Sequence, residues 1–137
     1  MRRLALVVAA GLVLAACGGE SDQEKAQKTV CDARADIGKQ VNELKALTPA
    51  TASVNGVRAN IDAIQDDLRK IVDAQSTLSD DRRAQVKAAT DQFTARVTQL
   101  VQEATRSLTL EDAATRLRAA VSDLATAYSQ SIGKIDC

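Results

Sequence analysis

Three cysteines are the residues of this chain whose chemistry says most about the protein. Cys17 directly follows an apolar run, whereas Cys31 and Cys137 stand at the two ends of a region with helical character. No two cysteines have the Cys-x-x-Cys spacing of dithiol redox enzymes, so a thiol-exchange enzyme is disfavoured. The chain has no histidine, which removes the most frequent metal ligand and the most frequent general base.

Neighbouring carboxylates are the other groups that could carry a reaction, as a general acid and a general base. Each pair also fits an ordinary role, at the positive end of a helix dipole or on a solvated helix face. No glycine-rich phosphate loop or nucleophile elbow accompanies them. We therefore expect no enzymatic activity, no metal and no cofactor. The pairs are Asp32 with Asp36, Asp66 with Asp67, Asp80 with Asp81, and Glu111 with Asp112.

The first seventeen residues have the order of a secretory signal peptide. Arg2 and Arg3 precede an apolar run from Leu4 to Ala16, and small residues precede Cys17. This run of 13 residues is too short to span a hydrocarbon core of roughly 30 Å as a helix. We therefore expect residues 1–16 to be removed during export.

The residues at the expected cleavage point, Leu14-Ala15-Ala16-Cys17, resemble the lipobox of bacterial lipoproteins. This resemblance covers residues 1–17 only, and no family is indicated for the rest of the chain. It implies that Cys17 is the lipid attachment site, carrying a diacylglyceryl thioether and an amine-linked acyl chain such as palmitate. It also implies anchoring to the outer face of the cell membrane, or to the outer membrane if the source bacterium has two membranes.

The composition of the exported part predicts an aliphatic helical core. Phe93 and Tyr128 are the only aromatic residues, and we expect both to fill the core. The chain has 18 basic and 18 acidic residues, so loss of Arg2 and Arg3 leaves 16 against 18, a net charge of −2. This balance does not favour a nucleic-acid partner.

Apolar residues after a short tether (17–22) recur at helical spacing and predict an all-α domain over residues 23–137. The clearest run follows coiled-coil steps of three and four residues. We expect helices over about 23–47, 53–76, 80–107 and 110–135, in an up-down-up-down antiparallel four-helix bundle. Between Ser107 and Leu110 there is neither Gly nor Pro, so a three-helix bundle with one long last helix is the alternative. The clearest run is Val54, Val57, Ile61, Ile64, Leu68 and Ile71.

Once Cys17 is lipidated, Cys31 and Cys137 form an even remainder in an oxidising compartment, which favours a disulfide. Two free thiols or an intermolecular bridge are the alternatives. In a four-helix bundle the start of the first helix and the end of the fourth lie together, so the pair can meet. If the last two helices were fused, the two cysteines could not meet. The cysteines therefore favour four helices.

Two functions fit this architecture. The first is a structural or protein-interaction module of the cell envelope, which contacts an envelope protein or a second copy of itself. The second is a carrier, whose core opens around a lipid or another apolar ligand; it would gain if Phe93 and Tyr128 lined an unfilled pocket. For the first function, we expect the loops far from the membrane to face the partner. The candidate loop residues are Thr48, Pro49, Thr51, Ser53, Ser107 and Thr109.

Overall fold

The computed structural model describes residues 18–47, 54–106 and 110–137, with side chains for 18–47, 55–105 and 115–137. Four α-helices make up almost all of this part of the chain, and a 3-10 turn follows the last of them. Helix α1 spans Asp22–Ala46, α2 spans Val54–Gln75, α3 spans Asp80–Arg106 and α4 spans Leu110–Gln130. The 3-10 turn, η1, spans Ile132–Lys134.

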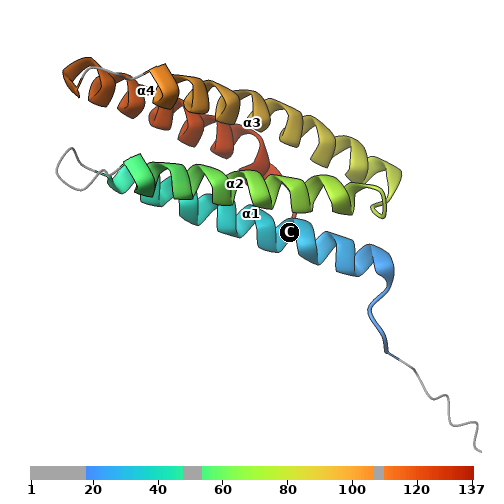
Figure 1. Ribbon diagram of the computed structural model, residues 1–137. Helices are drawn as coiled ribbons and strands as arrows, with labels where there is room; N and C mark the ends of the chain where they lie inside the picture. Colours follow the sequence, from blue (N-terminus) through green and yellow to red (C-terminus); the bar gives the residue numbers. More distant parts are fainter. Residues whose placement is uncertain (1–17, 48–53, 107–109) are drawn as a thin grey trace, which may run out of the picture.

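The four helices form the expected up-down-up-down antiparallel bundle (Figure 1). Each helix packs against its neighbours in chain order, and α4 closes the bundle by packing against α1. Because α3 and α4 are separate helices that lie side by side, the alternative with one long last helix is wrong.

The core is aliphatic and follows the predicted periodicity. Five of the six residues in the coiled-coil run of α2 are buried; the side chain of the sixth, Val54, lies outside the described residues. Ala104, which follows Val97 and Val101 at helical spacing on α3, is exposed. The fully buried large side chains come from α1, α2, α3, α4 and η1: Ile37, Val30, Ile64, Ile71, Phe93, Leu100, Val86, Leu124 and Ile132.

Helix α1 begins at a capping box. The Ser21 hydroxyl accepts a hydrogen bond from the Glu24 backbone N–H, and the Glu24 carboxylate accepts one from the Ser21 N–H. Glu24 is therefore engaged at the helix start, and Lys28 pairs with Asp32 instead, at 3.0 Å. Glu24 and Lys28 therefore form no ion pair with each other, although they lie four residues apart on the helix.

The last helix is shorter than predicted. Helix α4 ends at Gln130, about half-way along α1, and the chain then turns through η1 towards α1 (Figure 1). Tyr128, near the end of α4, fixes this register, because its hydroxyl donates a hydrogen bond to the carbonyl of Arg34 in the middle of α1. Consequently, the half of the bundle near the start of α1 is built from three helices and residues 131–137, here called the closing segment.

Phe93 and Tyr128 lie in the core beside one another. The Phe93 ring is fully buried and meets the half-buried Tyr128 ring edge to face, with centroids 6.1 Å apart. Gly38 of α1 makes room for this tyrosine, because a Cβ placed on Gly38 would lie 2.6 Å from the Tyr128 hydroxyl oxygen. The predicted role of both rings as core residues is therefore confirmed.

This packing predicts a coupled effect of two substitutions. Gly38→Ala should lower the free energy of unfolding by about 1–3 kcal/mol, because Tyr128 has to move away from its partner on α1. In a Tyr128→Phe background the same change should cost at least about 1 kcal/mol less, because the closest atom is gone and alanine favours the helix. Denaturant unfolding of the four variants measures this coupling.

Gly19→Ala is the control, because a Cβ on Gly19 would meet nothing within 4 Å. Equal costs of Gly38→Ala in the two backgrounds would contradict this assignment of the Gly38–Tyr128 contact.

Candidate functional site

The two cysteines of the exported domain are joined in a disulfide. Cys31 of α1 is half-buried and Cys137 is exposed, and their Cα atoms are 5.7 Å apart. The expected intramolecular disulfide is therefore present. It does not lie at the very end of the bundle. Cys31 lies nine residues into α1, about 14 Å from the helix start at 1.5 Å per residue.

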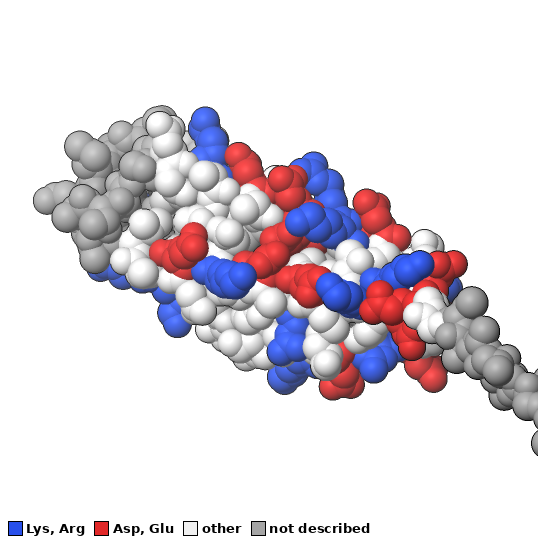
Figure 2. All heavy atoms as spheres, turned by 90° about the horizontal axis from the view of Figure 1, so that it is seen from below, with Lys and Arg blue, Asp and Glu red and all other residues white. Residues whose placement is uncertain are grey.

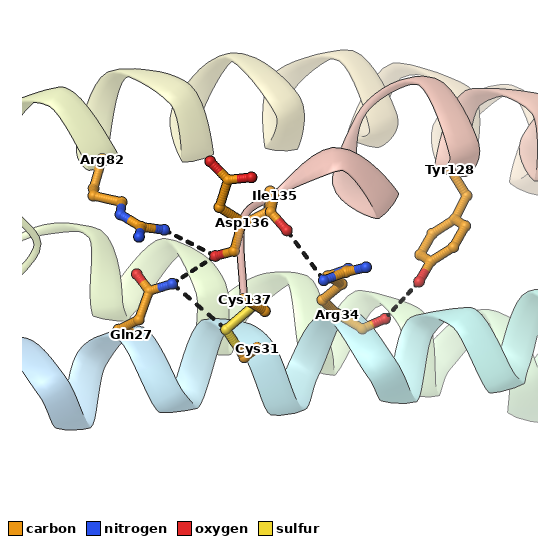
Figure 3. Close-up of a disulfide and its surroundings, with 8 residues drawn as sticks. All are labelled: Gln27, Cys31, Arg34, Arg82, Tyr128, Ile135, Asp136 and Cys137. Atoms are coloured by element: carbon orange, nitrogen blue, oxygen red, sulfur yellow. Dashed lines mark hydrogen bonds between the residues drawn. A yellow bond between two sulfur atoms is a disulfide. The ribbon is translucent and has the colours of Figure 1, made fainter.

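Three side chains hold the backbone of the closing segment beside the disulfide (Figure 3). The Gln27 side-chain amide and the Arg82 guanidinium donate hydrogen bonds to the carbonyl of Asp136, at 2.7 and 2.8 Å. The Arg34 guanidinium donates to the carbonyl of Ile135, at 3.1 Å. Because these donors come from α1 and α3, the segment bridges two helices that do not contact each other directly.

The closing segment also completes the core. Ile132 and Ile135 are buried, with 0% and 2% of their surface exposed, and belong to the same apolar cluster as Val30 and Val86. The two isoleucines contribute about 1.5–3 kcal/mol each, and the three hydrogen bonds about 0.5–1.5 kcal/mol each. Ordering seven residues costs about 1–2 kcal/mol per residue. These opposing contributions are of similar size, so the covalent bond decides whether the segment stays docked.

The turn between α2 and α3 lies at the same end of the bundle as the start of α1 (Figure 1). The guanidinium of Arg83 donates hydrogen bonds to the carbonyls of Gln75, Ser76 and Leu78. It therefore binds the last carbonyl of α2, which also accepts from the Leu78 N–H, and two carbonyls of the turn that follows. As predicted, α3 begins at Asp80, with two acidic residues in its first turn.

The predicted lipid attachment site and loop residues cannot be placed on this fold. Cys17, Thr48, Pro49, Thr51, Ser53, Ser107 and Thr109 all lie outside the described residues. The helix ends that flank the two loops, at Ala46, Val54, Arg106 and Leu110, lie at the end of the bundle opposite the start of α1 (Figure 1).

A polar surface groove between α3 and α4, with a volume of about 520 Å³, lies in that same far half of the bundle. Guanidinium, carboxylate and amide groups from both helices line its walls, and Ala119 and Ala120 form its small apolar part. Arg96 donates a hydrogen bond to Gln99 within it, at 2.8 Å. The polar lining residues are Arg96, Gln99, Gln102 and Glu103 of α3, and Arg116 and Asp123 of α4.

Charged side chains of both signs are interleaved on one face of the bundle (Figure 2). On the face shown in Figure 2, acidic and basic side chains alternate and form no patch of one sign. Neighbouring turns pair them, as in Lys87 with Asp91 at 2.5 Å. One carboxylate of this network, Asp67, is buried and pairs with Lys70 at 2.6 Å, and this hydrogen bond and charge raise the pKa of the Lys70 amine.

The buried polar side-chain groups of the described part of the chain are all hydrogen-bonded. Every buried side-chain nitrogen or oxygen there has a hydrogen-bond partner, and no group of three potential ligands is close enough to hold a metal ion. The buried hydroxyls of Thr90 and Ser131, for example, donate to the carbonyls of Val86 and Ala127. None of the described helices is long and apolar enough to cross a membrane.

The sequence predicted the disulfide, but it predicted neither the three side chains that hold the closing segment beside it nor the α3–α4 groove. Gln27, Arg34 and Arg82 are ordinary polar residues of helix surfaces, and their roles depend on where the closing segment crosses the bundle. Comparison of the chain with protein-family models, with curated proteins and with solved structures gives no match.

Proposed function

We propose that this protein is an extracytoplasmic lipoprotein whose helical bundle acts as a protein-interaction module of the cell envelope. The lipobox-like sequence ending at Cys17 supports the anchor. The capped start of α1 at Asp22, five residues after Cys17, supports display of the bundle close to the bilayer. The far half, with the α3–α4 groove, then faces away from the membrane.

The groove is the observation that carries the interaction role. Its guanidinium groups can donate two parallel hydrogen bonds to a carboxylate, and its amides can donate to and accept from a peptide backbone. Asp123 adds an acceptor for basic side chains. This mixture of both charges with amides suits a polypeptide surface, which presents the same groups.

The packing of the core does not support the alternative function as a carrier of apolar ligands. The two aromatic rings contact each other edge to face, and Phe93 is fully buried, as expected for core residues. The groove itself is mostly polar, which disfavours an acyl chain within it.

The anchor predicts a specific loss on substitution of Cys17. Cys17→Ser should abolish incorporation of labelled fatty acid and move the protein from the membrane to the soluble fraction, because serine cannot form the thioether. The Cys31→Ser/Cys137→Ser variant, which keeps Cys17, is the control and should remain labelled. Equal labelling of the Cys17→Ser protein would contradict the assigned attachment site.

The groove predicts site-specific contact with a protein. A photo-crosslinking amino acid at Gln99 should capture a protein in intact cells, whereas the same probe at the exposed Gln65 of α2 should not. Adding Arg116→Glu should reduce the Gln99 crosslink by about tenfold, because a charge reversal opposes a bound carboxylate. Arg69→Glu, on α2, is the matched control and should leave the crosslink unchanged.

Capture of a second copy of this chain would identify the module as self-associating. Equal crosslinking at Gln99 and Gln65 would contradict the groove as the contact surface. Capture of lipid at Gln99 in place of protein would favour the carrier.

A further inference from the structure

We infer that the Cys31–Cys137 disulfide is a reducible latch. A thiol reductant attacks the Cys137 sulfur, Cys31 leaves as the thiolate, and the closing segment then leaves the bundle. The inference goes beyond the proposed function and does not depend on the anchor or on the α3–α4 groove.

The two cysteine residues differ in exposure. Cys137 is exposed, whereas Cys31 of α1 is half-buried. Thiol–disulfide exchange requires a thiolate to reach one sulfur, and access strongly influences which sulfur is attacked. We therefore assign the sulfur of Cys137, the more exposed residue, as the electrophile.

The surroundings of Cys31 favour its departure. The Gln27 amide donates a hydrogen bond to the Cys31 sulfur, with 3.5 Å between the two atoms, and this bond strengthens when the sulfur becomes a thiolate. The guanidinium groups of Arg82 and Arg34 reach the closing segment from opposite sides and donate to its carbonyls (Figure 3). A Cys31 thiolate stabilised by the Gln27 hydrogen bond leaves faster.

The exchange balances with a dithiol as the reductant. The first thiolate of the dithiol bonds to the Cys137 sulfur, and the bond to Cys31 breaks with its electron pair on Cys31. The second thiolate of the dithiol then attacks the dithiol sulfur that is now bonded to Cys137. This releases Cys137 as a thiolate, which takes up a proton. Two electrons pass to the protein cysteines, and the dithiol becomes a disulfide.

Release of the closing segment follows from how it is held. Without the covalent bond it keeps two buried isoleucines and three side-chain hydrogen bonds, which roughly match the cost of ordering seven residues. Its departure uncovers apolar residues of α1 and α3 that share its cluster, including Val30, Ala33 and Val86. Reduction thus converts a closed bundle into one with an open apolar groove.

Reduced glutathione tests the direction of attack on the oxidised full-length protein. After a short incubation and alkylation, tryptic peptides should carry glutathione on residues 135–137 and the alkyl group on residues 29–34, with about tenfold preference. Cys17 lies in a separate tryptic peptide and does not interfere. Glutathione on Cys31, or equal amounts on the two cysteines, would overturn the assignment.

Gln27→Ala should move this distribution towards equal amounts, because Cys31 loses its hydrogen-bond donor. Gln23→Ala, one turn earlier on the same helix and exposed, should leave the distribution as it is in the unchanged protein. Equal effects of the two substitutions would contradict the role of Gln27.

Hydrogen exchange tests the release. The amides of Ser131, Lys134 and Ile135 are hydrogen-bonded in the closed form, so reduction should remove their protection while peptides of α2 keep theirs. The Cys31→Ser/Cys137→Ser variant should behave like the reduced protein. Retained protection of the segment, or loss of protection throughout the chain, would overturn the latch.

Discussion

Helix α4 runs antiparallel to α1 but ends beside its middle, where Tyr128 contacts Arg34, and this leaves half of the bundle without a fourth helix. The closing segment fills that space, and the disulfide to Cys31 holds it there. Two isoleucines and three hydrogen bonds only roughly match the entropy cost of ordering a segment of this length. Docking of the closing segment onto α1 and α3 therefore depends on one covalent bond between residues 106 positions apart.

Because α4 is short, the two halves of the bundle differ in structure. The half near the start of α1 combines the capping box, the α2–α3 turn held by Arg83 and the clamped closing segment. The other half presents the polar groove between two full helices. This division agrees with the proposed function, in which the half joined to the tether is held rigid and the half remote from it contacts a partner.

Much of this fold could be predicted from the sequence because heptad spacing dictates which face of each helix is buried. The run from Val57 to Ile71 and the acidic start at Asp80 gave the helices and one of their boundaries. The cysteines favoured two separate last helices, because a fused helix would hold Cys31 and Cys137 tens of ångströms apart.

The end of α4 could not be predicted. Ile132 and Ile135 keep helical spacing relative to Tyr128, although the α-helix ends at Gln130, before both isoleucines. The same isoleucines would be buried whether α4 continued to residue 135 or ended at Gln130. Only the need to bring Cys137 close to Cys31 favours the shorter helix. The groove was equally hidden, since its residues come from two helices and are individually ordinary surface residues.

The most direct test of the central claim is denaturant unfolding of the oxidised protein and of the Cys31→Ser/Cys137→Ser variant under identical conditions. If the disulfide holds the closing segment and so completes the bundle, the variant should lose about 2–4 kcal/mol of unfolding free energy, with an upper bound near 4.7 kcal/mol for a loop of about 100 residues. A difference below about 1 kcal/mol would contradict the account, because other contacts would then suffice to hold the segment.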